Sequence, residues 1–254
     1  MYSPEEIIAI TIEKGIGKVR KPLQEKLILG FIGGAMISLG YLAYIRVISS
    51  IVADWGSFAS LIGAMVFPIG LIVILLGGGE LVTGNMMTVA ASWFDRKISL
   101  TDLIANILTI ACANFVGAVF VAYLFGHVAG LTSSGVFLEE TLTLAQAKIS
   151  AEPLQAFVSG IGCNWFVGLA LWLCYGAKDS FGKYMGTWFP VMTFVAIGFQ
   201  HSVANIFLIS AAIFEGGATW FQFLTNFIPV FLGNIVGGSF LVAGLYYLAY
   251  KPKH

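Results

Sequence analysis

A long apolar stretch from about residue 61 to residue 94 is interrupted by a run that a lipid-facing helix does not tolerate. The run reads Gly77-Gly78-Gly79-Glu80-Leu81-Val82-Thr83-Gly84-Asn85. Irregular backbone at membrane depth occurs only where protein buries it or where it lines a water-filled cavity. We therefore expect this break to face a pore or a substrate site.

A second interruption lies in the other half of the chain. It reads Phe199-Gln200-His201-Ser202-Val203-Ala204-Asn205 and divides another apolar stretch. Broken helices in corresponding positions of two halves indicate the binding site of a transporter. The pair of breaks thus predicts a transporter or a channel.

The composition sets the class of protein. Hydrophobic residues make up 58% of the chain and charged residues only 10%, whereas soluble domains carry about 25% charged residues. The chain is therefore expected to be an integral membrane protein that contacts the lipid bilayer. Its formal net charge of zero gives no basis for binding nucleic acid through a basic field.

The cysteines indicate neither a disulfide framework nor a metal site. Cys112, Cys163 and Cys174 stand singly in apolar spans, without a neighbouring cysteine or histidine. We predict no metal and no cofactor.

Six apolar runs of membrane-spanning length predict an all-α integral membrane fold, with residues 1–254 forming a single membrane domain. The spans are expected at about 27–50, 59–94, 103–127, 153–176, 187–215 and 224–250, with the second and fifth broken. Residues 3–21 mix isoleucines with charges and predict an amphipathic helix on the membrane surface; a solvated helical tail is the alternative. Residues 128–152 are expected to be a long outside connection.

Eleven of the thirteen lysines and arginines fall on one side of these spans, and only Arg46 and Lys148 fall on the other. The positive-inside rule then places both termini in the cytoplasm of a multi-pass protein of the cell membrane.

An internal repeat links the halves, at about 27–127 and 153–250. One offset carries Asn85 onto Asn205 and the run Asn114-Phe115-Val116-Gly117 onto Asn234-Ile235-Val236-Gly237. Three spans per half is an odd number, so consecutive halves enter the membrane from opposite faces. This predicts an inverted 3+3 repeat with its site near the midplane.

His201 and Thr83 are the strongest candidates for the pore centre. His201 is the only histidine inside an apolar span, where an ionisable group is functional by default and an imidazole exchanges protons near neutral pH. The alternative is a structural histidine. Thr83 belongs to the opposite break and either bonds an anion, holds the histidine or caps the following half-helix. Half-helix N-termini near Asn85 and Asn205 favour an anion.

Several other residues have a functional and a plain structural interpretation. Lys148 draws anions toward the pore as part of an electropositive funnel, or is simply solvated. Glu80 is expected to bond nearby backbone amides or asparagines, because an unpaired charge there is costly. Hydrophobic constrictions that exclude water, or ordinary helix packing, are expected at Phe67, Leu71, Leu81 and Phe194.

Two other classes of function fit less well. A neutral-solute channel of the aquaporin type carries paired Asn-Pro-Ala boxes and a selectivity arginine, and neither is present here. An intramembrane enzyme needs a catalytic set at one depth, but Ser202 directly follows His201 and points elsewhere on a helix. We predict no catalytic residues and no enzyme activity.

The motifs Gly79-Glu80-Leu81-Val82-Thr83-Gly84-Asn85, Gly162-Cys163-Asn164-Trp165 and Gln200-His201-Ser202-Val203-Ala204-Asn205 resemble those of the formate/nitrite transporter family over nearly the whole chain. The resemblance implies an aquaporin-like six-helix protomer and a homopentamer with one pore in each protomer. It implies passage of small monovalent inorganic or organic anions, with a proton as the second partner.

The resemblance also suggests roles for single residues. Leu81, Val82 and Phe194 correspond to a cytoplasmic constriction, and Phe67 with Leu71 to a periplasmic one. Thr83 and His201 mark the chamber between them. Lys148 matches the funnel lysine, which Asn164 supports or accompanies in a structural role, while Gly84, Asn85 and Asn205 are structural residues of the breaks.

One position departs from the pattern. Formate channels of the family typically carry phenylalanine where this chain has Val82. The smaller side chain favours the hydrosulfide-channel or nitrite branch over formate. In every case a bare anion pays a large desolvation cost in an apolar slit, so we expect a proton to reach the anion by or through His201 before it crosses.

Overall fold

The computed structural model describes residues 1–51 and 55–251, and within these ranges it contains helices and no strands. The helices are α1 Pro4–Arg20, α2 Leu23–Ile48, α3 Ser57–Val66, α4 Ile69–Ile72, η2 Val73–Gly78, α5 Val82–Phe94, α6 Leu100–Val121, η3 Ala122–Val128, α7 Gly135–Ile149, α8 Pro153–Gly176, α9 Ser180–Ile197, α10 Ser202–Phe214, α11 Trp220–Ile235, η4 Val236–Gly244 and α12 Leu245–Tyr250.

Among the described residues, five helical stretches are long and apolar enough to cross a membrane. They are Leu23–Ile48, Ser57–Gly78, Leu100–Val128, Pro153–Gly176 and Trp220–Tyr250. A sixth is obtained if α9 and α10, which are bent by 52° at their break, count as one span. The prediction of an all-α membrane fold is confirmed.

The second predicted span is interrupted as expected, since the helical stretch Ser57–Gly78 is followed after a break by α5. Another predicted segment needs correction. The expected outside connection at 128–152 is largely helical, since α7 occupies Gly135–Ile149. Lys148 therefore sits in the last turn of a helix and not on a loop.

The breaks themselves follow from glycine. η2 ends at Gly78 with φ +106°, and α9 ends at Gly198 with φ +88°. Both values lie in the left-handed region that side chains with a Cβ disfavour. Each glycine turns the chain out of its helix before an extended residue, Leu81 or His201, starts the next one.

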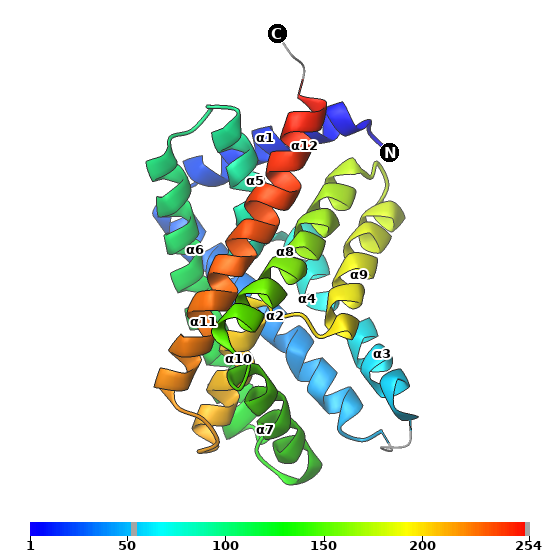
Figure 1. Ribbon diagram of the computed structural model, residues 1–254, viewed down its shortest axis with the longest axis vertical. Coiled ribbons are helices and arrows are strands. Elements are labelled where there is room, and N and C mark those ends of the chain that lie inside the picture. The colour runs from blue at the N-terminus through cyan, green and yellow to red at the C-terminus, as the bar shows by residue number, and fades with distance from the viewer. Residues whose placement is uncertain (52–54, 252–254) are drawn as a thin grey trace.

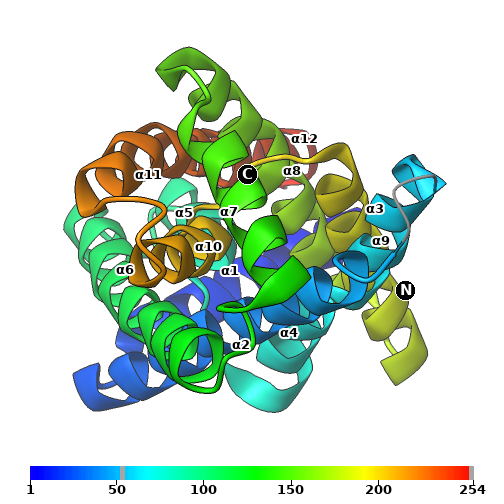
Figure 2. The same cartoon turned by 90° about the horizontal axis from the view of Figure 1, so that it is seen from below.

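The two ends of the molecule are built alike (Figure 1). α1 packs across one end against α5, and α7 packs across the other end against α10. Between them the long helices pair, α2 with α6 and α8 with α11. Figure 2, a view from the α7 end, shows these helices around α5 and α10. We name the two ends the α1 end and the α7 end.

α1 is an amphipathic helix whose apolar side is buried by the protein itself. Ile7, Ile8 and Ile12 are buried, while Glu5 and Glu13 are exposed, and a Ser3–Glu6 capping box closes the first turn. α12 ends beside α1, and Lys251 forms an ion pair with Asp95 there. The described ends of the chain thus lie together at the α1 end.

Helix pairs approach closely at matching glycines. A Cβ on Gly117 would lie 2.1 Å from the carbonyl oxygen of Phe31, and one on Gly237 would lie 2.3 Å from that of Ile161. These contacts hold α6 against α2 and the start of η4 against α8. The sequence repeat Asn-x-x-Gly therefore marks close helix crossings in both halves.

We expect Gly117→Ala to destabilise the protein, because the added methyl group overlaps a backbone carbonyl that cannot move without shifting a helix. The cost should be about 1–3 kcal/mol, seen as a lower melting temperature in detergent. Gly17→Ala is the matched control, since no atom lies within 4 Å of a Cβ built there. Equal melting temperatures for the two variants would contradict the close-packing account.

Candidate functional site

Asn114 on α6 holds the first break in place. Its Oδ1 accepts from the amide of Val82 at 2.8 Å, and its Nδ2 donates to the carbonyl oxygens of Gly30 and Glu80 at 2.7 and 2.8 Å. Asn114 is fully buried. One side chain therefore satisfies backbone groups on both sides of the interruption, which membrane burial makes obligatory.

Asn234 on α11 does the same for the second break. Its Oδ1 accepts from the amide of Ser202 at 3.0 Å, and its Nδ2 donates to the carbonyl oxygens of Gly160 and Gln200. The first amide of each half-helix is thus used by an asparagine. The expectation that the dipole ends of these half-helices favour an anion stays a prediction.

A second set of bonds repeats with the same spacing. Asn85 donates to Glu80 and to Asn106, both at 2.9 Å. Asn205 donates to Gln200 and Asn226 at 2.8 and 2.9 Å. The expectation that Glu80 bonds an asparagine is confirmed, and Gln200 takes its place in the other half.

The repeat extends to the helices at the two ends. The side-chain amide of Asn106 donates to the carbonyl oxygen of Lys18 in α1, and that of Asn226 donates to the carbonyl oxygen of Lys148 in α7. Lys18 and Lys148 thus occupy equivalent places in the two halves. Their surroundings differ, because Lys18 forms an ion pair with Glu80, whereas the Lys148 amino group donates to the carbonyl oxygen of Gly198.

Thr83 and His201 meet at the centre. Thr83 Oγ1 lies 2.9 Å from His201 Nε2, and His201 Nδ1 accepts from the amide of Ala204 at 3.1 Å. A nitrogen that accepts cannot carry the proton of a neutral imidazole, so Nε2 carries it and donates to Thr83. His201 caps α10, and the Thr83 hydroxyl does not cap α5.

A cavity of about 120 Å³ opens toward the α7 end and reaches His201. Its lining includes Lys148, Phe67, Phe194 and Asn205. Lys148 Nζ donates to the carbonyl oxygen of Gly198 at 3.1 Å, and no carboxylate of the described residues forms an ion pair with it. Burial lowers the pKa of the Lys148 amino group.

Phe194 belongs to this cavity and not to the slit predicted with Leu81 and Val82. Its ring lies edge-on to Phe67 with centroids 5.9 Å apart and is stacked on His201 at 6.0 Å. Phe194 lies near the end of α9. The chain then turns at Gly198 and leads to His201, so the Phe194 ring lies on the side of His201 that faces Lys148. Phe67 and Phe194 thus form one aromatic pair beside the cavity.

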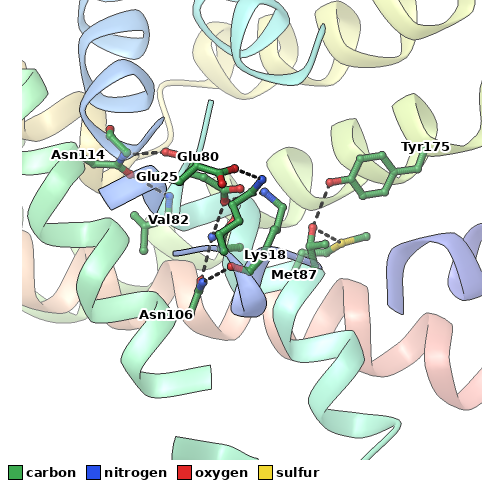
Figure 3. Close-up of polar contacts among 12 residues, drawn as sticks. Lys18, Glu25, Glu80, Val82, Met87, Asn106, Asn114 and Tyr175 are labelled. Carbon is green, nitrogen blue, oxygen red and sulfur yellow. Dashed lines mark hydrogen bonds and ion pairs between the residues drawn. The ribbon is translucent and has the colours of Figure 1, made fainter. Parts of the chain in front are cut away.

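A second cavity, of about 330 Å³, opens at the α1 end. Lys14, Lys18, Lys21, Glu80 and Tyr175 contribute to its lining. Lys18 Nζ and Glu80 Oε2 form an ion pair at 2.7 Å (Figure 3). Burial lowers the pKa of the Lys18 amino group, and Glu80 offsets part of that effect.

The two cavities do not meet. Leu81, Val82 and Thr83 line neither of them, and their exposed fractions are 3%, 1% and 0%. The first turn of α5 thus closes the path between Glu80 and His201. Leu71 is also buried and lines neither cavity.

Asn164 is a fully buried residue of α8. Its Nδ2 donates to the carbonyl oxygens of Thr83 and Asn234 at 3.1 and 2.7 Å, so it ties α8 to α5 and α11, and it lines neither cavity. Gly84 packs against Leu171 of the same helix. These bonds fit the structural role expected of Asn164, and its support of Lys148 stays a prediction.

Sequence reasoning missed the Lys18–Glu80 ion pair and the roles of Gln200, Asn106 and Asn226. The signal was present in the repeat. The offset that aligns Asn85 with Asn205 also aligns Glu80 with Gln200 and Asn106 with Asn226. The position of Tyr41, discussed below, had no sequence signal.

Comparison with known proteins agrees with this geometry. The sequence profile described as "Formate/nitrite transporter" matches residues 5–248. The chain belongs to the formate/nitrite transporter family. It is 53% identical to the uncharacterized transporter YrhG of Bacillus subtilis, covering 98% of this chain and 94% of that protein. It is 47% identical to the formate channel BtFdhC of Bacillus thuringiensis, covering 100% and 97%.

Solved structures give the same family fold. An FNT family ion channel superposes with a TM-score of 0.88 at 26% identity, covering 96% of this chain and 98% of that one. A pentameric formate channel with formate bound superposes with a TM-score of 0.76 at 27% identity, covering 90% and 97%. Members of this family are channels and transporters, so the chain is a membrane transport protein and not an enzyme.

We expect Lys18→Met to destabilise the protein, because it leaves the Glu80 carboxylate buried without a cation. The loss should be about 3 kcal/mol, or on the order of 10 °C in melting temperature. Adding Glu80→Gln should restore most of it, since Gln200 fills the equivalent place without charge.

Lys21→Met is the matched control, because its ion pair with Glu25 is exposed and worth about 1 kcal/mol or less. Equal melting temperatures for Lys18→Met and the double variant would show that the buried charge is not the cause.

Proposed function

We propose that this protein conducts small monovalent weak-acid anions across the cell membrane, with formate as the first candidate. The support is family membership and 47% identity to a protein named a formate channel. The α1 end, with its many lysines and arginines, faces the cytoplasm by the positive-inside rule. By analogy with the pentameric formate channel, five copies assemble, each with its own path.

The observation that carries the proposal is a lysine beside the central pair that has no carboxylate partner within residues 1–51 and 55–251. Lys148 and His201 line the same cavity, so an anion drawn in by the lysine arrives next to the His201 ring. From this cavity, the path of the permeating species leads past Leu81 and Val82, which are apolar and buried. A charged species is excluded there, because its desolvation is too costly, and a neutral acid is not.

The bonds of His201 limit how a proton reaches the anion. Both ring nitrogens are occupied, one by Ala204 and one by Thr83. The imidazole is therefore a hydrogen-bond donor that positions the Thr83 hydroxyl, and it becomes a proton carrier only if Nδ1 releases the Ala204 amide. We assign the proton supply to water in the Lys148 cavity, and transfer through His201 is the competing hypothesis.

The identity of the anion rests on two opposing observations. Val82 departs from the phenylalanine expected of formate channels, which favours hydrosulfide or nitrite. The close relative named a formate channel favours formate. We give the relative more weight, because Val82 is held by its backbone bond to Asn114 and lines neither cavity, so its size alone does not define a slit.

Lys148→Gln should lower formate flux into proteoliposomes several-fold at low ionic strength, because the charge that attracts the anion is lost. The effect should shrink at high salt, and Lys148→Arg should retain most of the flux. Stopped-flow assays with formate, nitrite, hydrosulfide and chloride measure this. If wild-type vesicles pass no weak-acid anion faster than empty vesicles, the proposed function is wrong.

His201→Asn should leave the pH dependence of flux close to that of the wild type, because asparagine keeps the helix-capping acceptor and water supplies the proton. Thr83→Val, which places at 83 the residue type found at the equivalent position 203, should lower flux by about tenfold or less, the effect of one hydrogen bond. A flat pH profile in His201→Asn would instead assign the proton route to the imidazole.

A further inference from the structure

Tyr41 of α2 contributes to the wall of the Lys148 cavity. Its side chain is buried, with 7% exposed, and it lines the cavity with Lys148 and His201. Three aromatic rings fix it, because its centroid lies 5.7 Å from that of Phe67, 6.0 Å from that of Phe207 and 5.6 Å from that of Tyr44. The tyrosine is therefore held in one place.

The hydroxyl group of Tyr41 has no hydrogen-bond partner among the residues that the structure describes. The side-chain polar atoms that are both unbonded and fully enclosed in this part of the chain belong to Thr132, Asn164, Ser202 and Ser210. The Tyr41 oxygen is not among them, so it touches open space. Because Tyr41 and Lys148 line the same cavity, the open space beside the Tyr41 hydroxyl is this cavity.

Other polar groups of this cavity are already occupied. The side-chain amide of Asn205 gives its two hydrogens to Gln200 and Asn226, and His201 uses both ring nitrogens. Lys148 gives one hydrogen to Gly198 and keeps two. Donors that remain for a guest are thus Lys148 and Tyr41.

Tyr41 differs from its neighbour Tyr44 in position. Tyr44 lies one turn nearer the α7 end of α2, beside Gly63 of α3. Tyr41 packs on Phe67, which in turn packs on Phe194, and Phe194 stacks on His201. Tyr41 therefore belongs to the aromatic wall that continues to the central histidine.

We propose that Tyr41 donates a hydrogen bond to an oxygen atom of the anion held by Lys148, and so favours oxygen acids such as formate and nitrite over hydrosulfide. Hydroxyl donors bond anionic oxygen over short distances and strongly, whereas sulfur is a weak acceptor. A two-atom acceptor such as carboxylate can bond the lysine through one oxygen and the tyrosine through the other. This inference rests on the proposed function and specifies its substrate class.

The test is Tyr41→Phe in proteoliposomes, which removes one oxygen atom and keeps the ring contacts. Formate flux at limiting concentration should fall about five- to tenfold, as expected for one hydrogen bond to a charged group. Hydrosulfide flux should stay within about twofold of the wild-type value under the same rule. The half-saturating formate concentration should rise accordingly.

Tyr246→Phe is the matched control, because Tyr246 stacks on Trp172 and lines neither cavity. It should change neither flux. Melting temperature and particle size of each variant verify that the fold is kept.

The outcomes separate the two proposals. Suppose that the wild type conducts formate. If Tyr41→Phe then lowers formate and hydrosulfide flux by the same factor, or changes neither flux, the role of Tyr41 is overturned while the channel function stands. If wild type conducts no weak-acid anion, the proposed function itself fails. A selective loss of formate flux supports the inference.

Discussion

The structure depends on the bracing of two interrupted helices by buried asparagines. Backbone groups released from a helix inside a membrane have no water to bond, so every break needs partners from the protein. Asn114 supplies them at the first break and Asn234 at the second. Each side chain accepts a hydrogen bond from one backbone amide and donates to two backbone carbonyl oxygens. With both breaks fixed, α5 and α10 start at defined points, and Thr83 and His201 come within hydrogen-bond distance.

Function lies where the two halves depart from one another. The bracing bonds are the same in both, yet Leu81 corresponds to His201, Thr83 to Val203 and Glu80 to Gln200. The first two exchanges place one imidazole and one hydroxyl on opposite breaks, so they meet across the middle. The third gives Lys18 a carboxylate partner, whereas Lys148 has none among the residues that the structure describes. A nearly symmetric scaffold thus carries an asymmetric electrostatic path.

The buried charge at the α1 end is both a structural and an electrostatic element. Glu80 is 3% exposed and bonds Lys18 and Asn85, so it joins α1 to the break and to α5. At the α7 end the same geometry is made without charge, by Gln200, Asn205 and Asn226. Of these two equivalent sets of bonds, the one at the α1 end therefore includes a buried ion pair and its desolvation cost. This ion pair lies at the cavity of the α1 end, whose lining includes three lysines.

The sequence by itself determined the membrane class, the positions of both breaks, the central pair His201 and Thr83 and the family. The family follows from the resemblance of three motifs, and the other features follow from composition, local interruption of apolar runs and a single repeat offset, none of which needs knowledge of distant contacts. Only the tertiary structure decided that Phe194 pairs with Phe67, that Asn164 bonds Thr83 and Asn234, that Lys18 neutralises Glu80 and that Tyr41 reaches the Lys148 cavity. Each of these depends on which helix faces are brought together, and packing between segments far apart in the chain leaves no periodic signal in the sequence.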